Sequence, residues 1–295
     1  MELKKYSVCI ITEAKVIKIV KDNNNFLVDT ENGKQYCFDK VILTTGGRSY
    51  PKTGSDGSGY KLAKKLGHSI VPTVPALVQL CGSDDFYKII AGVRSEGMVS
   101  LYVDNEMMRT EVGEIQFTDY GISGIPVFQV SRIAAYGLFE KKKVRMVADV
   151  LPAYNESQLE ELVKTRILLH TENSLEEFMC GLSNKKLCLF AIKQAGRKTA
   201  DLIKDMSFED VLKVVLNLKK IVFHIVDTKG YHTAQVTAGG VPVTELDEGL
   251  QSKFTKGLYF AGEIVDVDGI CGGYNLQWAF AGGYVAGSKA AERKG

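Results

Sequence analysis

Two glycine-containing stretches near the carboxyl end of the chain have the residue types that hold a large ligand. In the first, the apolar segment 258–261 runs into Gly262 and Glu263, and the second is the pair Gly272 and Gly273. Glycine lets a backbone approach a bulky molecule because no Cβ stands in the way. A carboxylate at the end of a buried strand is placed to accept hydrogen bonds from ligand hydroxyl groups, and a solvated loop acid is the alternative.

The residues after the second glycine pair predict a helix over 274–291. They are mostly alanine, glycine and apolar residues, with no proline. The first N–H groups of a helix have no partner inside it and attract negative charge. We therefore predict that the backbone of Gly272, Gly273, Asn275 and Leu276 faces an anionic part of the ligand. A plain glycine-rich helix cap is the alternative interpretation.

The composition is that of an ordinary globular protein. A chain of 295 residues accommodates one large or two average domains, and 45% hydrophobic residues supply a sizeable core. The net charge of +2 comes from residues spread along the chain, which disfavours a nucleic-acid partner. Because no apolar run reaches about 18 residues and no secretion signal is present, we expect no membrane insertion and a cytoplasmic location.

The cysteines and histidines do not form a metal or redox motif. The six cysteines lie far apart without a C-x-x-C pair, and the four histidines cluster with none of them. This predicts reduced thiols and no metal site. Cys271, beside the second glycine pair, is either a redox thiol next to a cofactor or inert, and the lack of a neighbouring cysteine in the sequence favours the inert interpretation.

The first part of the chain alternates short β-rich runs with turn signals. These runs are at 8–11, 16–20, 26–30, 36–38 and 41–43. They predict a small antiparallel meander that leads into one apolar strand. The glycine-rich string 54–59 then opens a helix that ends before Gly67. This order of strand, loop and helix indicates the α/β fold class.

The character of the sequence changes at Pro72 and Pro75, so we predict a domain boundary at Val74. The predicted division places residues 1–74 and 238–295 in one domain and residues 75–237 in a second. Within the second domain, 75–152 is β-rich, 153–219 is helical and 220–237 returns to strands. Ser174 and Glu177 have the spacing of a capping box at the start of one of the helices.

Two further groups of polar residues have open roles. The segment 119–124 has polar side chains among glycines, and it either lines a substrate pocket or caps the helix that begins near Pro126. Tyr231 and His232 are candidate proton donors to a ligand, but a lone histidine is more often structural. The catalytic residues therefore stay unassigned.

Four motifs in the same order resemble those of a bacterial family of FAD-dependent oxidoreductases. The motifs occupy 44–51, 117–124, 236–241 and 257–277, so the resemblance covers essentially the whole chain. Members of the family include aminoacetone oxidase-like and bile-acid-reductase-like flavoproteins. The resemblance implies a partial FAD/NAD(P)-binding domain of the glutathione-reductase type, interrupted by an insert with a β-barrel-like part and a helical part.

The resemblance also implies roles for particular residues. Thr45, Gly46 and Gly47 would form a strand end beside the dinucleotide, although an ordinary strand-ending turn has the same residue types. Glu263 would accept hydrogen bonds from ribitol or ribose hydroxyls. The helix start after Gly273 would face the pyrimidine edge of the flavin and stabilise the anionic reduced ring.

One part of the family pattern is missing from this sequence. Family members begin with a strand, a G-x-G-x-x-G turn and a helix, and then carry an acidic residue that binds the adenosine ribose, whereas this chain has no such fingerprint. The string 54–59 has the spacing G-x-x-G-x-G and follows the wrong strand. We therefore expect that the AMP half of the site is lacking, either because the chain is truncated or because a separate polypeptide supplies it.

These observations lead to two hypotheses about function. The first is an FAD-dependent oxidoreductase that transfers a hydride between FAD and a reduced nicotinamide, NAD(P)H, or a small organic substrate. The second is a non-catalytic fragment or subunit that binds a partner and lacks competent FAD binding. The sequence identifies neither the substrate nor the electron acceptor nor the oligomeric state.

Overall fold

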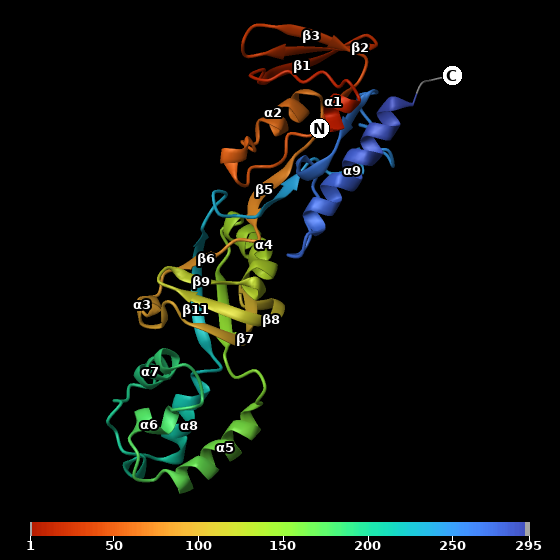
Figure 1. Cartoon of the computed structure of the whole chain (residues 1–295). Helices are drawn as coiled ribbons and strands as arrows, with labels where there is room; N and C mark the ends of the chain where they lie inside the picture. Colours follow the sequence, from red (N-terminus) through yellow and green to blue (C-terminus); the bar gives the residue numbers. More distant parts are fainter. Residues whose placement is uncertain (1, 293–295) are drawn as a thin grey trace. The chain divides into compact units, whose positions relative to one another are not determined.

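The computed structural model describes residues 2–292, and the chain forms two compact units (Figure 1). Unit 1 joins Met1–Thr73 with Thr237–Gly295, and unit 2 is Val74–Val236. The sequence places both boundaries one residue further along the chain. The chain passes between the units through β5 (Val71–Ala76) and β12 (Val236–Gly240), which pair in a two-stranded sheet.

The amino-terminal strands of unit 1 form the predicted antiparallel meander. It consists of β1 (Val16–Asp22), β2 (Asn25–Thr30) and β3 (Gln35–Phe38). In β2 the residues alternate between the two faces of the sheet, so Phe26 and Val28 are buried. This alternation explains why the period-2 pattern predicts the strands correctly.

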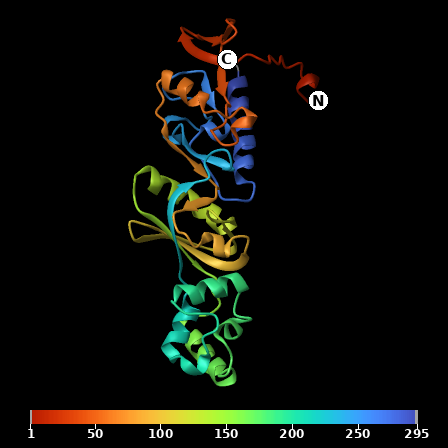
Figure 2. The same ribbon diagram turned by 90° about the vertical axis from the view of Figure 1, so that its left-hand side faces the viewer.

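The predicted strand at 8–11 is wrong. After the short helix α1 (Glu2–Lys5) the chain is irregular up to β1, and Figure 2 shows it leading away from the meander. Val8, Ile10 and Ile11 are exposed. A strand needs a neighbour for its N–H and C=O groups, and within residues 2–292 no strand pairs with this segment.

The remaining elements of unit 1 follow the α/β order. The 3₁₀ turns are η1 (Pro51–Thr53), η3 (Val243–Glu245) and η4 (Gly262–Ile264), the helices are α2 (Ser58–Lys65) and α9 (Tyr274–Ala291), and the strands are β4 (Val41–Leu43) and β13 (Leu258–Phe260). Strands β4 and β13 are parallel, with Ile42 opposite Tyr259. The core between these elements includes Phe260 and Ile264.

Unit 2 contains a closed six-stranded barrel in the order β10-β11-β6-β9-β8-β7. The strands are β6 (Leu80–Gly82), β7 (Arg94–Val103), β8 (Glu106–Thr118), β9 (Gly121–Gly124), β10 (Val144–Asp149) and β11 (Ile221–Thr228), and the barrel part also contains α3 (Tyr87–Ile90) and α4 (Ile125–Phe139). Closure gives every strand two neighbours, so the sheet has no free edge. The expected β-barrel-like part is therefore confirmed.

A group of helices follows the barrel strand β10, as Figures 1 and 2 show. They are α5 (Glu156–Leu169), α6 (Leu175–Met179), α7 (Lys185–Gln194), η2 (Ile203–Asp205) and α8 (Phe208–Leu216). The predicted capping box is present, because the Ser174 side chain accepts the N–H of Glu177 and the Glu177 side chain accepts the N–H of Ser174. The helices share one apolar core with the barrel. None of the helices described here is both long and apolar enough to span a bilayer.

Candidate functional site

The two strand ends that the sequence singles out lie side by side. Because β4 and β13 are parallel neighbours, their carboxyl ends meet at one edge, and the N–H of Ala261 donates to the carbonyl of Leu43 at 3.0 Å. The segment 45–47 and the pair Gly262 and Glu263 follow directly. The structure therefore brings together two of the three predicted groups of cofactor residues at an edge where α/β sheets bind ligands.

The Glu263 carboxylate joins three segments of unit 1. Its Oε2 accepts the N–H of Gly47 at 3.1 Å, and its Oε1 accepts the N–H of Thr237 at 2.5 Å. Burial raises the pKa of the Glu263 carboxyl above its usual value, although the two N–H donors act in the opposite direction. The first partners of this acid are thus backbone groups of the protein, and the predicted contact with ribitol or ribose hydroxyls would use the remaining lone pairs.

Gly47 is required by the close packing around this junction. A Cβ at this position would lie 2.5 Å from Oγ1 of Thr237 and 2.8 Å from Oε2 of Glu263. Both distances are shorter than van der Waals contact, so any side chain would force the junction apart. A turn that merely ends a strand has no such requirement.

Thr237 is a residue of this junction that the sequence does not single out. Its buried Oγ1 accepts the N–H groups of Arg48 at 2.8 Å and Ser49 at 3.0 Å. A threonine beside two glycines has no distinctive pattern, and its only signal was its place in the motif 236–241. The contact depends on residues almost 190 positions apart, which no local pattern records.

The third group of predicted residues lies at the start of α9. Gly273 precedes the helix with a φ of 92°, a left-handed conformation that favours glycine. The Asn275 side chain accepts the N–H of Gly269 at 2.8 Å and donates to its carbonyl at 3.0 Å. The Trp278 indole donates to the carbonyl of Gly262 at 3.2 Å, which fixes α9 against the end of β13.

The surroundings of α9 correct the prediction of a packed helix. Gly282 and Ala286 are its buried residues, whereas Leu276, Phe280 and Tyr284 are 67%, 76% and 77% exposed. These three residues are four positions apart and therefore lie on one face of the helix. We call Leu276, Phe280 and Tyr284 the outer face of α9.

The other sequence candidates are distributed differently. Tyr231 and His232 belong to unit 2, whereas all predicted cofactor residues belong to unit 1. Cys271 is half-buried and forms no disulfide. Within residues 2–292 no three His, Cys, Asp or Glu side chains are grouped closely enough to hold a metal ion.

The segment 119–124 leads directly into α4. Its residues Gly121–Gly124 form β9 of the barrel, and Gly124 precedes α4 without any side-chain cap. Gly124 therefore occupies the N-cap position of α4, as the capping alternative expects, but no side chain of the segment caps the helix, and Ser123 is buried in the barrel. The pocket-lining alternative stays a prediction.

A buried Ser–His–Glu arrangement in unit 1 has a structural role. His68 contacts Glu245 through Nδ1 at 2.7 Å and Ser252 Oγ through Nε2 at 2.8 Å, as a nucleophile and its base would. The Ser252 oxygen, however, also accepts the N–H groups of Phe254 at 3.1 Å and Thr255 at 2.9 Å. This hydroxyl is buried and fully engaged with the protein, so we assign it no nucleophilic role.

Comparison with known proteins relates almost the whole chain to one family. Residues 1–289 match the model of the HI0933-like protein Rossmann domain. The chain is 40% identical to 3-dehydro-bile acid delta(4,6)-reductase of Clostridium scindens, over 99% of this chain and 72% of that protein. It is 29% identical to ribosomal RNA dihydrouridine synthase of Escherichia coli, over 96% of this chain and 68% of that protein.

Similarity to solved structures is weaker. The structure of Aquifex aeolicus GidA in the form II crystal matches 95% of this chain at 16% identity, with a TM-score of 0.33. The chain spans 44% of the length of GidA. A TM-score this low does not establish a common arrangement of the elements.

Proposed function

The chain belongs to the HI0933-like Rossmann-domain family, and we propose from this that the complete protein is an FAD-dependent oxidoreductase. The observation that carries the proposal is the edge formed by β4, β13 and the start of α9. There, Glu263, Gly47 and Thr237 are joined by hydrogen bonds, and Trp278 holds the helix beside them. Similarity to a reductase at 40% identity supports the same class of reaction.

The residues at this edge fit the flavin part of FAD. Gly272 and Gly273 are exposed, so a ligand reaches their backbone and the first N–H groups of α9. A helix start stabilises a nearby negative charge by about 0.3–1 kcal/mol when exposed. When bound, FAD supplies the hydride chemistry. The part of the protein is to orient the ring and to favour its reduced, anionic form.

We propose a small organic molecule as the substrate, with NAD(P)H as a hydride donor. The two relatives are named for different substrates, because one name refers to a bile acid and the other to ribosomal RNA. The bile-acid relative is the more similar of the two, and the charge of +2 gives no strongly basic surface for RNA. Reduction of ribosomal RNA uridines by the purified protein, with no activity on small molecules, would overturn this choice.

The test of FAD binding compares two glycine variants. We expect the purified chain to be yellow, or to become yellow with added FAD, and to release FAD on denaturation. Gly47→Ala should lose the flavin, because the new Cβ displaces Thr237 and Glu263. Gly283→Ala is the matched control, since a Cβ there meets open space. A wild-type chain that stays colourless with FAD contradicts binding by this chain alone.

The second candidate function is binding of a further polypeptide, and a specific surface favours it. In the parallel pair, Val41 and Leu43 bond to β13, so the N–H and C=O of Ile42 point to the opposite edge. No strand lies at that edge within residues 2–292. In the same unit, the outer face of α9 exposes three large apolar side chains, and such patches often mark an interaction surface.

We propose that the occupant of this surface is a βαβ unit that adds a parallel strand beside β4 and supplies the AMP half of the FAD site. Such a unit belongs either to the same polypeptide or to a separate one. The coding sequence directly upstream of Met1, read in frame, distinguishes these sources through the presence or absence of a G-x-G-x-x-G fingerprint.

Co-expression tests the occupant directly. The partner would be the part of the Clostridium scindens relative that lies outside the matched 72%. We expect a complex that binds FAD, and Phe280→Asp on the outer face should prevent it. Phe139→Asp is the matched control, because Phe139 is a similarly exposed phenylalanine of unit 2. Equal loss of the complex in both variants would contradict the proposed surface.

A further inference from the structure

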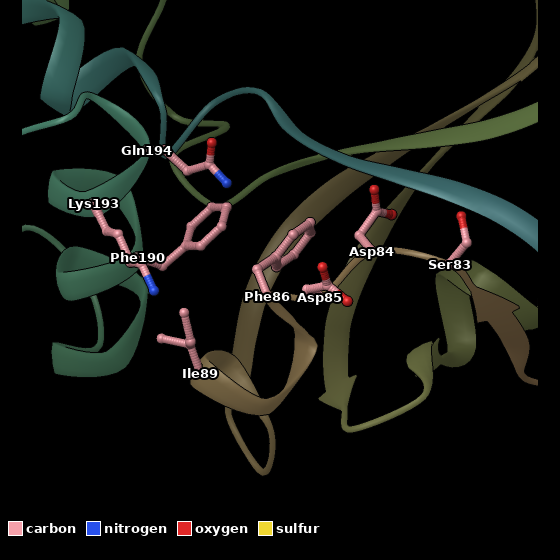
Figure 3. A pocket seen from close by; sticks show the side chains of 8 residues that line it. All are labelled: Ser83, Asp84, Asp85, Phe86, Ile89, Phe190, Lys193 and Gln194. Carbon is pink, nitrogen blue, oxygen red and sulfur yellow. The ribbon is translucent and has the colours of Figure 1, made fainter.

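Unit 2 contains a hollow of about 480 Å³ whose two walls come from different parts of the chain (Figure 3). The segment 83–89, which follows β6, forms one wall, and α7 forms the other. A second hollow of about 230 Å³ shares Asp84, Phe86, Phe190 and Gln194 with it. The larger hollow has the size of a small-molecule pocket.

The first wall is held rigidly by a chain of hydrogen bonds. Asp84 Oδ2 accepts the Tyr87 hydroxyl at 2.5 Å and the N–H of His224 at 2.9 Å, and Oδ1 accepts Nδ1 of His224 at 2.8 Å. Although burial raises the pKa of Asp84, these hydrogen bonds hold it below its usual value. Asp84 is therefore an ionised carboxylate that already has three donors, and its function is to position the segment.

The second wall is a helix face with an apolar base. Phe190 of α7 is buried, and its ring centroid lies 4.7 Å from that of Phe86 on the first wall. This contact joins the two walls through the shared core of unit 2. Phe86 is partly exposed, so it offers aromatic surface to a ligand, and the buried ring of Phe190 supports it.

Two opposite charges on the two walls have no protein partner. Asp85 lies on the first wall and Lys193 on α7, as Figure 3 shows. Within residues 2–292 neither side chain takes part in an ion pair or a hydrogen bond, and they do not pair with each other. The two opposite charges lie on opposite walls of the hollow, so together they are complementary to a dipolar molecule.

We propose that this hollow binds a small zwitterion with an apolar side chain, such as an apolar α-amino acid. The ammonium group contacts Asp85, the carboxylate contacts Lys193 and the neighbouring amide of Gln194, and the side chain packs against Phe86. This site lies wholly within unit 2 and does not depend on FAD, so the result is independent of the proposed oxidoreductase function.

The test is calorimetric titration of the full chain with L-phenylalanine and two analogues that each lack one charge. Phenethylamine has no carboxylate and hydrocinnamate has no ammonium group. We expect each analogue to bind about tenfold more weakly than L-phenylalanine, since each loses one charge-assisted contact. Equal affinity of either analogue, or no binding of L-phenylalanine, would overturn the proposal.

Variants of the two unpaired charges complete the test. Lys193→Gln and Asp85→Asn should each weaken the binding of L-phenylalanine about tenfold. Both side chains are exposed, so the fold should be unchanged, and circular dichroism checks this. Lys198→Gln and Glu160→Gln are matched controls outside the hollow and should bind normally. Equal affinity in all four variants would contradict the assignment of Asp85 and Lys193.

Discussion

The strands of unit 2 and those of unit 1 are paired in different ways. Unit 2 closes six strands into a barrel, and its helices share the apolar core of that barrel. Unit 1 distributes its strands over separate small sheets, and the outer face of α9 exposes large apolar side chains. We infer that apolar packing completes unit 2, whereas unit 1 combines an apolar core of its own with the polar junction at Glu263 and leaves the outer face of α9 exposed.

The largest expected effect is loss of a core ring in unit 2. Phe223 is fully buried against Phe86, Tyr87 and Phe117, so Phe223→Ala should reduce the free energy of unfolding of unit 2 by about 3–5 kcal/mol. Far-ultraviolet circular dichroism follows the helices during urea unfolding, and most helical residues lie in unit 2. Fluorescence of Trp278, the single tryptophan, follows unit 1. An equal shift of both transitions would show that the units do not unfold separately.

The next effect is removal of the polar junction in unit 1. Glu263→Ala leaves the N–H groups of Gly47 and Thr237 unpaired, which costs about 1–3 kcal/mol for each buried donor. We expect the Trp278 transition to move to lower urea and the unit 2 transition to stay. Glu248→Ala, at an exposed acid of unit 1, is the control. If the junction does not stabilise unit 1, Glu263→Ala and Glu248→Ala should have the same Trp278 transition.

A smaller effect depends on pH. Asp56 accepts the N–H of Ser58 at 2.8 Å and pairs with Lys15 at 3.1 Å, and these hydrogen bonds lower its pKa from 3.8 to about 2. Because the folded-state pKa is lowered, the stabilisation is present above pH 3.8 and is lost as the pH falls toward 2.

Asp56→Asn should therefore destabilise unit 1 above this window by about 0.5–1 kcal/mol, since the carboxylate is partly in water. Below the window, the variant and the wild type should converge. Urea unfolding followed by Trp278 fluorescence at a series of pH values measures this. A difference that persists at pH 2 would assign the stabilisation to another cause.

The smallest effect is expected from a phenylalanine that is exposed, in contrast to the buried Phe223. Phe280 is 76% exposed on α9, so Phe280→Ala should change the free energy of unfolding of unit 1 by less than about 0.5 kcal/mol. The contrast with Phe223→Ala measures how differently the two units use a phenylalanine. A loss of about 3 kcal/mol at Phe280 would mean that this face is already covered in solution.

Local patterns predicted the elements whose formation depends on near neighbours. The apolar run 41–43, the helix 274–291 and the capping box at Ser174 and Glu177 all appear as expected. The run 8–11 has the same kind of β-rich pattern but forms no strand. A strand forms only where another strand accepts its hydrogen bonds, and the local sequence does not report whether one is present.

The sequence by itself determined the α/β order, the glycines at the strand ends and the family to which the chain belongs. Only the tertiary structure decided that Glu263 binds the backbone of Gly47 and Thr237, residues 216 and 26 positions away, and that the outer face of α9 is exposed. The physical reason is that periodicity and turn chemistry act over a few residues, whereas a hydrogen-bond junction and the burial of a face depend on which distant segments fold against each other.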